Sequence, residues 1–144
     1  SCTGVDVSEE ALKVAKNNAS KNEMVVDFSF LDILKEDLSE KEFDIIVSNP
    51  PYIPNADRAL MHKNVLDYEP DIALFVDDRT PLVFYQAIAE KAIISLKKGG
   101  KLYFEIHENF GAEVCQLLSA LGYSDIELRK DLQGKDRMVR GKKE

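Results

Sequence analysis

Strand and helix signals alternate along this chain, and that alternation limits its fold more than any other feature. The strand signals are apolar segments at residues 2–7, 25–31, 43–48, 101–106, 124–131 and 136–143. Helical patterns separate most of them, at residues 8–22, 80–98 and 109–121. This order is typical of an α/β fold with a largely parallel sheet and covering helices. Gln133-Gly134 lies between the last two strands and predicts an antiparallel pair.

Local signals mark where the elements begin and end. Ser8, followed by two glutamates, is predicted to cap the first helix, and Thr80-Pro81 is predicted to start the second. The Lys-Lys-Gly-Gly stretch at 97–100 predicts its end. The continuous apolar run Ile45–Val47 predicts a strand covered on both faces. Residues 49–79 show no clear periodicity, and a connection that long is usually functional or disordered.

Composition and charge exclude several classes of protein. The 144 residues are 44% hydrophobic and 31% charged, which fits one ordinary globular domain. No apolar run approaches the ~20 residues that span a bilayer. The net charge of -7 is a poor match for a phosphate backbone. From Arg129 onward there are seven Lys/Arg against three Asp/Glu, which we interpret as a solvated edge strand and not a nucleic-acid patch.

The cysteines and histidines do not predict a metal site. Cys2 and Cys115 lie far apart without metal-ligand spacing, and His62 and His107 stand alone. Reduced thiols, and hence a cytoplasmic location, are expected. The chain has no initiator Met and begins inside a strand signal, so we expect it to be part of a longer protein.

The stretch Ser48-Asn49-Pro50-Pro51-Tyr52 carries the strongest chemical signal. A residue before proline is held extended, and neither proline has an N–H, so the backbone of Pro50 and Pro51 offers only carbonyl acceptors. Asn49 adds a side-chain carbonyl, and Tyr52 adds an aromatic wall. Such an edge would receive a flat group that carries an NH₂. A proline-rich turn that merely ends a strand is the structural alternative.

Two other strand ends carry carboxylates. Asp6 is well placed to accept hydrogen bonds from the ribose hydroxyls of a nucleotide-like cofactor, and Asp32 from an adenine amino group, with Ile33 covering the ring. Each Asp could equally belong to an ordinary strand-to-loop turn. The three strand ends together favour a ligand crevice at the carboxyl ends of the strands.

Other polar residues have weaker signals. Glu69 is predicted to shape the long connection, and Glu105 to lie at the edge of the cleft. His107 is interpreted as part of a polar strand end and not of an acid–base pair. His62 and Cys115 are interpreted as structural.

The segments "TGVDVSEEALKVAKNNA", "FLDIL", "FDIIVSNPPYIP", "YEPDIALF" and "LVFYQAIAEKA", in this order, resemble the HemK/PrmC methyltransferases. Asn-Pro-Pro-aromatic alone is shared with DNA and RNA amino-methyltransferases, whereas its extension into "NPPYIP" and "YEPDIALF" is more specific. The resemblance implies a Rossmann-like, class I S-adenosylmethionine-dependent methyltransferase sheet with helices on both faces. It implies methylation of a glutamine side-chain amide in the Gly-Gly-Gln motif of peptide-chain release factors.

The resemblance also implies roles for individual residues. Asp6 would hold the ribose of S-adenosylmethionine, and Asp32 with Ile33 would border its adenine. Asn49 would contact both cofactor and substrate, and Asn49 with the Pro50 carbonyl would bind the two amide hydrogens. Pro51 would fix the turn, and Tyr52 would pack on the glutamine amide.

The chain also departs from the family's pattern. The family's first strand, its glycine-rich loop and its helical N-terminal domain are absent from residues 1–144, which we therefore interpret as a partial catalytic domain. The missing strand is central in the family's sheet, so either a preceding segment or another chain is expected to fill the gap. "VDDRTP" and "HENFG" also differ from the family's usual loops. Two alternatives stay open, a DNA or RNA amino-methyltransferase and a non-catalytic Rossmann-like binding module.

Overall fold

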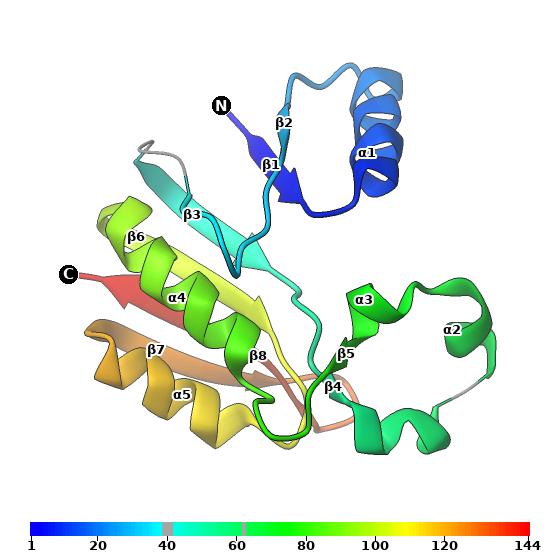
Figure 1. The fold of residues 1–144 in the computed structure, drawn as a ribbon. Helices are drawn as coiled ribbons and strands as arrows, with labels where there is room; N and C mark the ends of the chain where they lie inside the picture. The colour runs from blue at the N-terminus through cyan, green and yellow to red at the C-terminus, as the bar shows by residue number, and fades with distance from the viewer. Residues whose placement is uncertain (39–41, 62) are drawn as a thin grey trace. The chain divides into compact units, whose positions relative to one another are not determined.

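The structure is a computed structural model that describes residues 1–38, 42–61 and 63–144. The chain divides into two compact units, Ser1–Asp37 and Leu38–Glu144, each of which is described by itself (Figure 1). His62, interpreted above as structural, lies outside the described residues.

The first unit is a strand–helix–strand unit. It contains β1 (Thr3–Asp6), α1 (Glu9–Lys21) and β2 (Asp27–Phe30). The two strands pair in parallel, with Asp6 opposite Phe30 at their carboxyl ends. Ser8 caps α1 as predicted, because its hydroxyl accepts a hydrogen bond from the N–H of Ala11 at 3.2 Å. Leu12 on α1 is buried.

The second unit is built on a four-stranded mixed sheet. Its strands, in spatial order, are β3 (Phe43–Ser48), β6 (Leu96–Glu105), β8 (Asp136–Lys143) and β7 (Tyr123–Lys130). β3 and β6 are parallel, and β8 is antiparallel to both of its neighbours. The predicted antiparallel pair at the end of the chain is confirmed. β3 has the predicted bounds.

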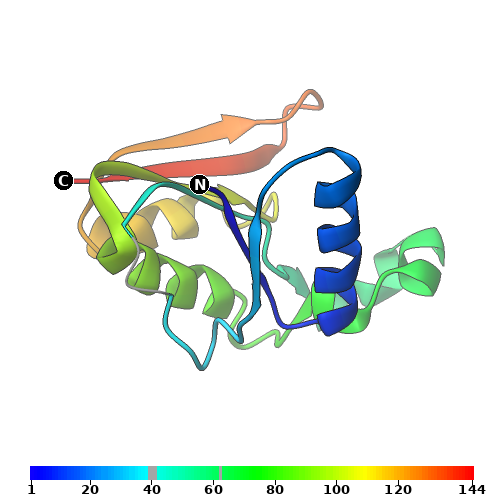
Figure 2. The same cartoon turned by 90° about the horizontal axis from the view of Figure 1, so that it is seen from above.

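Two helices, α4 (Val83–Ser95) and α5 (Gly111–Ala120), lie on one face of this sheet (Figures 1 and 2). α4 packs on β6, and α5 packs on β7 and β8. The buried side chains between the helices and the sheet are Tyr85, Ile88, Ala89, Ala92, Leu102, Phe104, Val114, Leu118, Tyr123 and Val139. This layer is the hydrophobic core of the unit and holds β6 in place, and β3 is held through its pairing with β6.

The expectation that β3 is covered on both faces is wrong for this chain. Ile45 is 57% exposed and Val47 is 73% exposed. Both side chains point to the same face because they are two residues apart on a strand. Among the described residues, β3 pairs with β6 alone, and the helices of this unit pack on one face. An apolar run without alternation therefore did not indicate burial here.

Two predicted element ends also need correction. α4 begins at Val83, not at Thr80, and Leu82 precedes it without a side-chain cap. Thr80 belongs to a preceding turn in which its carbonyl accepts from the N–H of Val83 at 3.1 Å. Lys97 to Gly100 lie in β6 and not at a helix end, because the strand starts at Leu96, which pairs with Phe43.

The long connection after β3 contains short elements that the sequence did not predict. They are β4 (Ile53–Pro54), the 3₁₀ helix η1 (Asn55–Leu60), α2 (Lys63–Tyr68), α3 (Asp71–Leu74) and β5 (Phe75–Val76). β4 and β5 pair in parallel, and the side-chain amide of Asn55 donates to the carbonyl of Val76 at 2.9 Å. Arg58 lies 4.3 Å from the ring centre of Phe75 and forms an ion pair with Asp71. The connection is therefore folded around its own contacts.

No helix within the described residues is long and apolar enough to cross a membrane.

Candidate active site

Asp6 lies at the carboxyl end of β1, where its side chain is exposed. Its Oδ1 accepts a hydrogen bond from the backbone N–H of Ser8 at 2.8 Å. This contact is the strand-to-loop turn that was the structural alternative for Asp6. A carboxylate has about four acceptor positions, so the turn leaves capacity for a ligand.

Asp32 follows β2 at the same end of the two-stranded sheet as Asp6. The N–H of Leu31, next to Asp32, donates to the carbonyl of Asp6 at 3.0 Å. Asp32 Oδ1 accepts from the N–H of Leu34 at 3.1 Å, and Oδ2 lies 2.8 Å from Lys35 Nζ. The hydrogen bond to Asp32 raises the pKa of the Lys35 ammonium. Asp32 therefore starts a turn, and its contact with an adenine stays a prediction, as does that of the half-buried Ile33.

The Asn49-Pro50-Pro51-Tyr52 stretch leads directly from the end of β3 into β4. Asn49 is exposed, Pro50 is buried, and Pro51 and Tyr52 are half-buried. Pro50 and Pro51 thus form a stretch of backbone without N–H donors, while Asn49 stays exposed. This arrangement is consistent with an edge of hydrogen-bond acceptors. It is also the turn that ends β3, which was the structural alternative.

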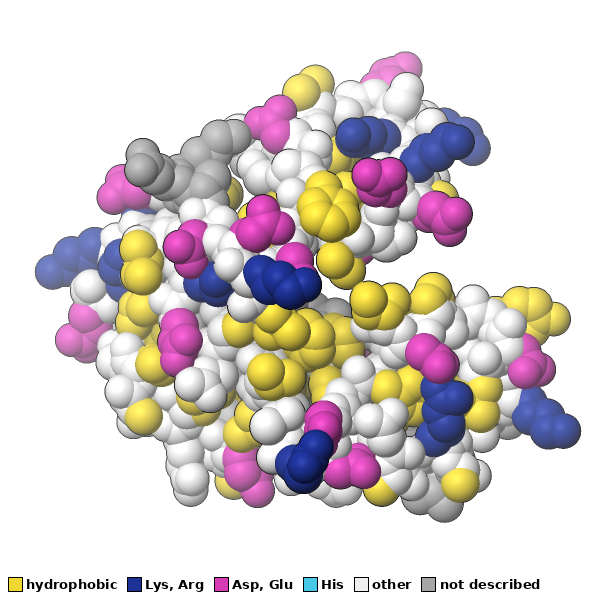
Figure 3. Space-filling model, viewed as in Figure 1, with side chains coloured by type: hydrophobic (Ala, Val, Ile, Leu, Met, Phe, Trp, Pro, Cys, Tyr) yellow, Lys and Arg dark blue, Asp and Glu magenta, His cyan; other side chains and the backbone are white. Residues whose placement is uncertain are grey.

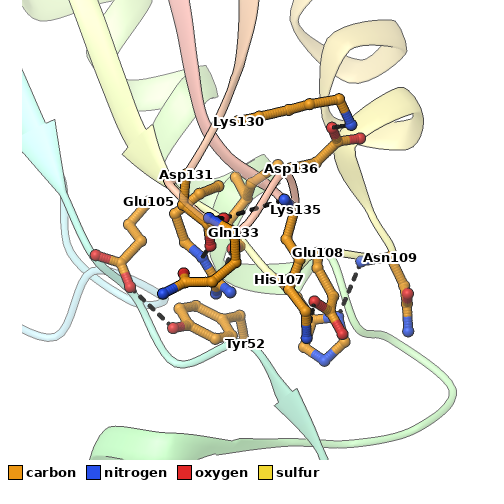
Figure 4. Close-up of polar contacts among 12 residues, drawn as sticks. Tyr52, Glu105, His107, Glu108, Asn109, Lys130, Asp131, Gln133, Lys135 and Asp136 are labelled. Carbon is orange, nitrogen blue, oxygen red and sulfur yellow. Dashed lines mark hydrogen bonds and ion pairs between the residues drawn. The ribbon is translucent and has the colours of Figure 1, made fainter.

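Tyr52 reaches the end of the neighbouring strand. Its hydroxyl donates to Glu105 Oε1 at 2.9 Å, and Glu105 is the last residue of β6 (Figure 4). The register explains the contact, because Ser48 at the end of β3 pairs with Phe104. Burial, followed by the hydrogen bond to Glu105, raises the pKa of the Tyr52 phenol, and the Arg137 guanidinium opposes this effect.

His107 lies beside the Tyr52 ring. The two ring centres are 6.0 Å apart with an interplanar angle of 71°, an edge-to-face arrangement. His107 Nδ1 accepts from the N–H of Asn109 at 3.2 Å, and Nε2 lies 3.5 Å from Asp57 Oδ2. The imidazole therefore links the end of β6 to η1.

The other carboxylates near this strand end have separate partners. Glu108 Oε2 lies 2.6 Å from Lys135 Nζ, and this contact lowers the pKa of the Glu108 carboxyl (Figure 4). Glu69 is exposed and follows the last residue of α2, where its backbone N–H donates to the carbonyl of Val65 at 2.9 Å. Cys115 is half-buried on α5. Within the described parts of the chain, no group of three or more His, Cys, Asp or Glu could hold a metal ion.

Sequence reasoning missed Asp57 and Arg137. Asp57 lies in the connection that showed no periodicity, so nothing in the pattern placed it near His107. Arg137 is on β8, and its carbonyl accepts from the N–H of Ile106 at 2.9 Å. The predicted antiparallel strand could have brought Arg137 to this edge, but its register is a tertiary property.

A mixed sheet with a crossover order, and with polar residues at the carboxyl ends of its parallel strands, defines an α/β domain of the Rossmann-like type. The chain belongs to the methyltransferase domain family, whose model matches residues 1–139.

Curated relatives resemble the chain over most of its length. A release factor glutamine methyltransferase of Flavobacterium psychrophilum is 46% identical over 136 residues, which are 94% of this chain and 48% of the relative. A release factor glutamine methyltransferase of Bacteroides thetaiotaomicron is 43% identical over 93% of this chain and 49% of the relative. The resemblance to this group is confirmed. The chain spans about half the length of these relatives.

Solved structures share the fold at low identity. A methyltransferase of Pyrococcus furiosus matches 98% of this chain and 61% of its own, with a TM-score of 0.68 and 20% identity. A SAM-dependent O-methyltransferase of Thermotoga maritima matches 98% of this chain and 49% of its own, with a TM-score of 0.68 and 16% identity. These likenesses confirm the predicted fold class.

Proposed function

We propose that the complete protein containing this chain methylates the side-chain amide nitrogen of a glutamine in a peptide-chain release factor, with S-adenosylmethionine as the methyl donor. The observation that carries the proposal is the Asn49-Pro50-Pro51-Tyr52 edge at the carboxyl end of β3, where the two prolines offer carbonyl acceptors and no N–H. The names of the relatives support the substrate. Because that substrate acts in translation, we propose a cytoplasmic location.

The residues present in the first unit fit part of such a cofactor. Asp6 is exposed, and its Oδ1 accepts a hydrogen bond from the backbone N–H of Ser8. Its carboxylate can therefore accept from ribose hydroxyls, while Ile33 offers an apolar side chain next to Asp32. When bound, S-adenosylmethionine would supply a methyl group activated by the sulfonium.

The chain's own residues would orient the glutamine amide nitrogen, which is a poor nucleophile. An amide nitrogen is weakly nucleophilic because its lone pair is delocalised into the carbonyl. The Asn49 side-chain oxygen and the Pro50 carbonyl would accept the two amide hydrogens and orient the nitrogen, which in favourable cases contributes up to ~7–11 kcal/mol. The same acceptors would favour the N–H bonds as positive charge grows on nitrogen. As the N–CH₃ bond forms, the bond from the methyl group to sulfur breaks and S-adenosylhomocysteine would be the leaving group. The methylated nitrogen then loses one proton to water, and no strong base is required because a positively charged amide nitrogen is a strong acid.

Charge pairing weighs against the nucleic-acid alternative. Six of the seven basic residues from Arg129 onward lie within ion-pair distance of a carboxylate, and the seventh, Lys143, donates to two backbone carbonyls. Figure 3 shows blue side chains beside magenta ones on the visible face. A phosphate backbone needs clustered, uncompensated positive charge.

The test uses the complete protein with labelled S-adenosylmethionine, release factor and, separately, DNA. We expect label on the release factor, at glutamine. Asn49→Ala should lower kcat about 100-fold or more while S-adenosylhomocysteine affinity changes less than about threefold, because the lost acceptor acts on the substrate amide. Label on adenine of DNA instead, or no transfer at all despite cofactor binding, would refute the proposal.

A further inference from the structure

The Tyr52 side chain is held at two points by residues from outside its own segment. Its hydroxyl donates to Glu105 Oε1 at 2.9 Å, and its ring lies edge-to-face with His107 (Figure 4). The hydroxyl contact limits rotation at the polar end of the ring, and the imidazole limits it at the side. The two contacts together select one orientation of the ring.

Glu105 is itself placed by secondary structure. As the last residue of β6 it pairs with Met138 on β8, and its carbonyl lies 3.4 Å from the hydroxyl of the buried Tyr85. The carboxylate therefore projects from a rigid strand end.

The charge of Glu105 is balanced from the neighbouring strand. Arg137 on β8 interacts electrostatically with both Glu105 and Tyr52. It is held by Asp131 Oδ2, 3.3 Å from its Nε, and by the carbonyl of Ile106, 3.4 Å from its Nη1. In the contact between the two side chains the Tyr52 hydroxyl donates and the Glu105 carboxylate oxygen accepts.

We propose that Glu105 is a positioning residue that fixes the Tyr52 ring as the platform for the substrate amide. This inference rests on the proposed function, in which Tyr52 packs on the glutamine. If the Tyr52 ring could rotate, the amide plane and its nitrogen would not be held in line with the methyl donor. Loss of the Glu105 contact should therefore lower turnover and leave cofactor binding unchanged.

The experiment compares four single variants and one double variant of the complete protein. Glu105→Ala removes the acceptor, Glu105→Gln keeps an acceptor without the charge, and Tyr52→Phe removes the donor. Glu108→Gln is the matched control, because it makes the same charge change three residues further on, at a carboxylate that pairs with Lys135.

We expect Glu105→Ala to lower kcat with release factor about 10-fold, and Glu105→Gln to lower it less. S-adenosylhomocysteine affinity should stay within about twofold, and Glu108→Gln should resemble the wild type. Tyr52→Phe combined with Glu105→Ala should be no worse than the more severe single variant, since both remove one contact. Additive losses, or an equal loss in Glu108→Gln, would overturn the proposal.

A second measurement needs no substrate. Nuclear magnetic resonance of ¹³Cζ-labelled tyrosine, with Tyr52→Phe to assign the signal, follows the ionisation of the phenol. Glu105→Gln should lower the pKa of Tyr52, and Glu108→Gln should leave it as in the wild type. An unchanged titration in Glu105→Gln would refute the contact, even where the Ala variant does not fold. A wild-type protein that fails to methylate release factor would instead refute the proposed function, and the titration would still decide whether Glu105 holds Tyr52.

Discussion

Replacing Asp6 by Asn tests the proposed ribose contact, because the structure separates two roles of this side chain. Asp6 Oδ1 accepts from the N–H of Ser8 at 2.8 Å and so supports the turn between β1 and α1. An asparagine keeps that oxygen and replaces the other one by an NH₂ donor. Asp6→Asn should therefore preserve the turn and lose the acceptor available to a ribose hydroxyl.

The size of the effect follows from the kind of hydrogen bond that is lost. A hydrogen bond to a charged group contributes about 1.5–3 kcal/mol. One such bond corresponds to roughly a 10- to 150-fold weaker affinity at 1.4 kcal/mol per factor of ten. The free energy of unfolding should change by less than about 0.5 kcal/mol, since Asp6 is exposed and the Ser8 contact survives. Asp6→Ala should lose both the affinity and part of the turn.

Calorimetry with S-adenosylhomocysteine on the complete protein measures the affinity, and urea unfolding measures the stability. Asp44→Asn is the control, because it removes the same charge from an exposed carboxylate at the start of β3, where Asp44 pairs with Lys97 at 2.7 Å. Its affinity should match the wild type. If Asp6→Asn binds S-adenosylhomocysteine as tightly as the wild type, Asp6 does not hold the ribose and the assignment of this strand end is wrong.

Three further predictions concern the second unit. Tyr123→Phe should lower the free energy of unfolding by about 1 kcal/mol, because the buried hydroxyl donates to the Ala89 carbonyl at 2.8 Å. Tyr85→Phe should lower it less, because the hydrogen bond of Tyr85 to the Glu105 carbonyl is 3.4 Å long. Urea unfolding that ranks the two variants in the reverse order would contradict this prediction. Burial is the main cause that raises the pKa values of Tyr52, Tyr85 and Tyr123 above 10.0. The stability that their protons provide is therefore complete below about pH 10 and is lost as the pH rises through the folded-state pKa values. A free energy of unfolding that does not fall between pH 9 and 11 would contradict this prediction. The 144-residue chain alone should self-associate through the outer edge of β3, and Ile45→Lys should reduce this association in light scattering. Light scattering that shows the same association in Ile45→Lys as in the wild type would contradict the prediction.

Elements with strong local signals could be predicted from the sequence. β3 has its predicted bounds because an apolar run meets two prolines, and Ser8 caps α1 because its hydroxyl precedes a helical pattern. The start of β6 was missed, because Lys97 to Gly100 resemble a helix end and join the sheet only through pairing with Phe43. The two-residue strands β4 and β5 depend on each other across 22 positions, from Ile53 to Phe75, so no local pattern shows them.

The same distinction applies to the candidate site. Prolines 50 and 51 remove backbone donors wherever the chain runs, so the acceptor edge follows from sequence alone. The orientation of Tyr52 does not, because its hydroxyl contact lies 53 residues away and exists only when β3 and β6 align with Ser48 beside Phe104. A slip of one residue in this register would turn the Glu105 side chain to the other face of the sheet. An Asn-Pro-Pro-Tyr motif therefore supplies the hydrogen-bond acceptors of such a site, and the register of the neighbouring strand determines the orientation of its tyrosine ring.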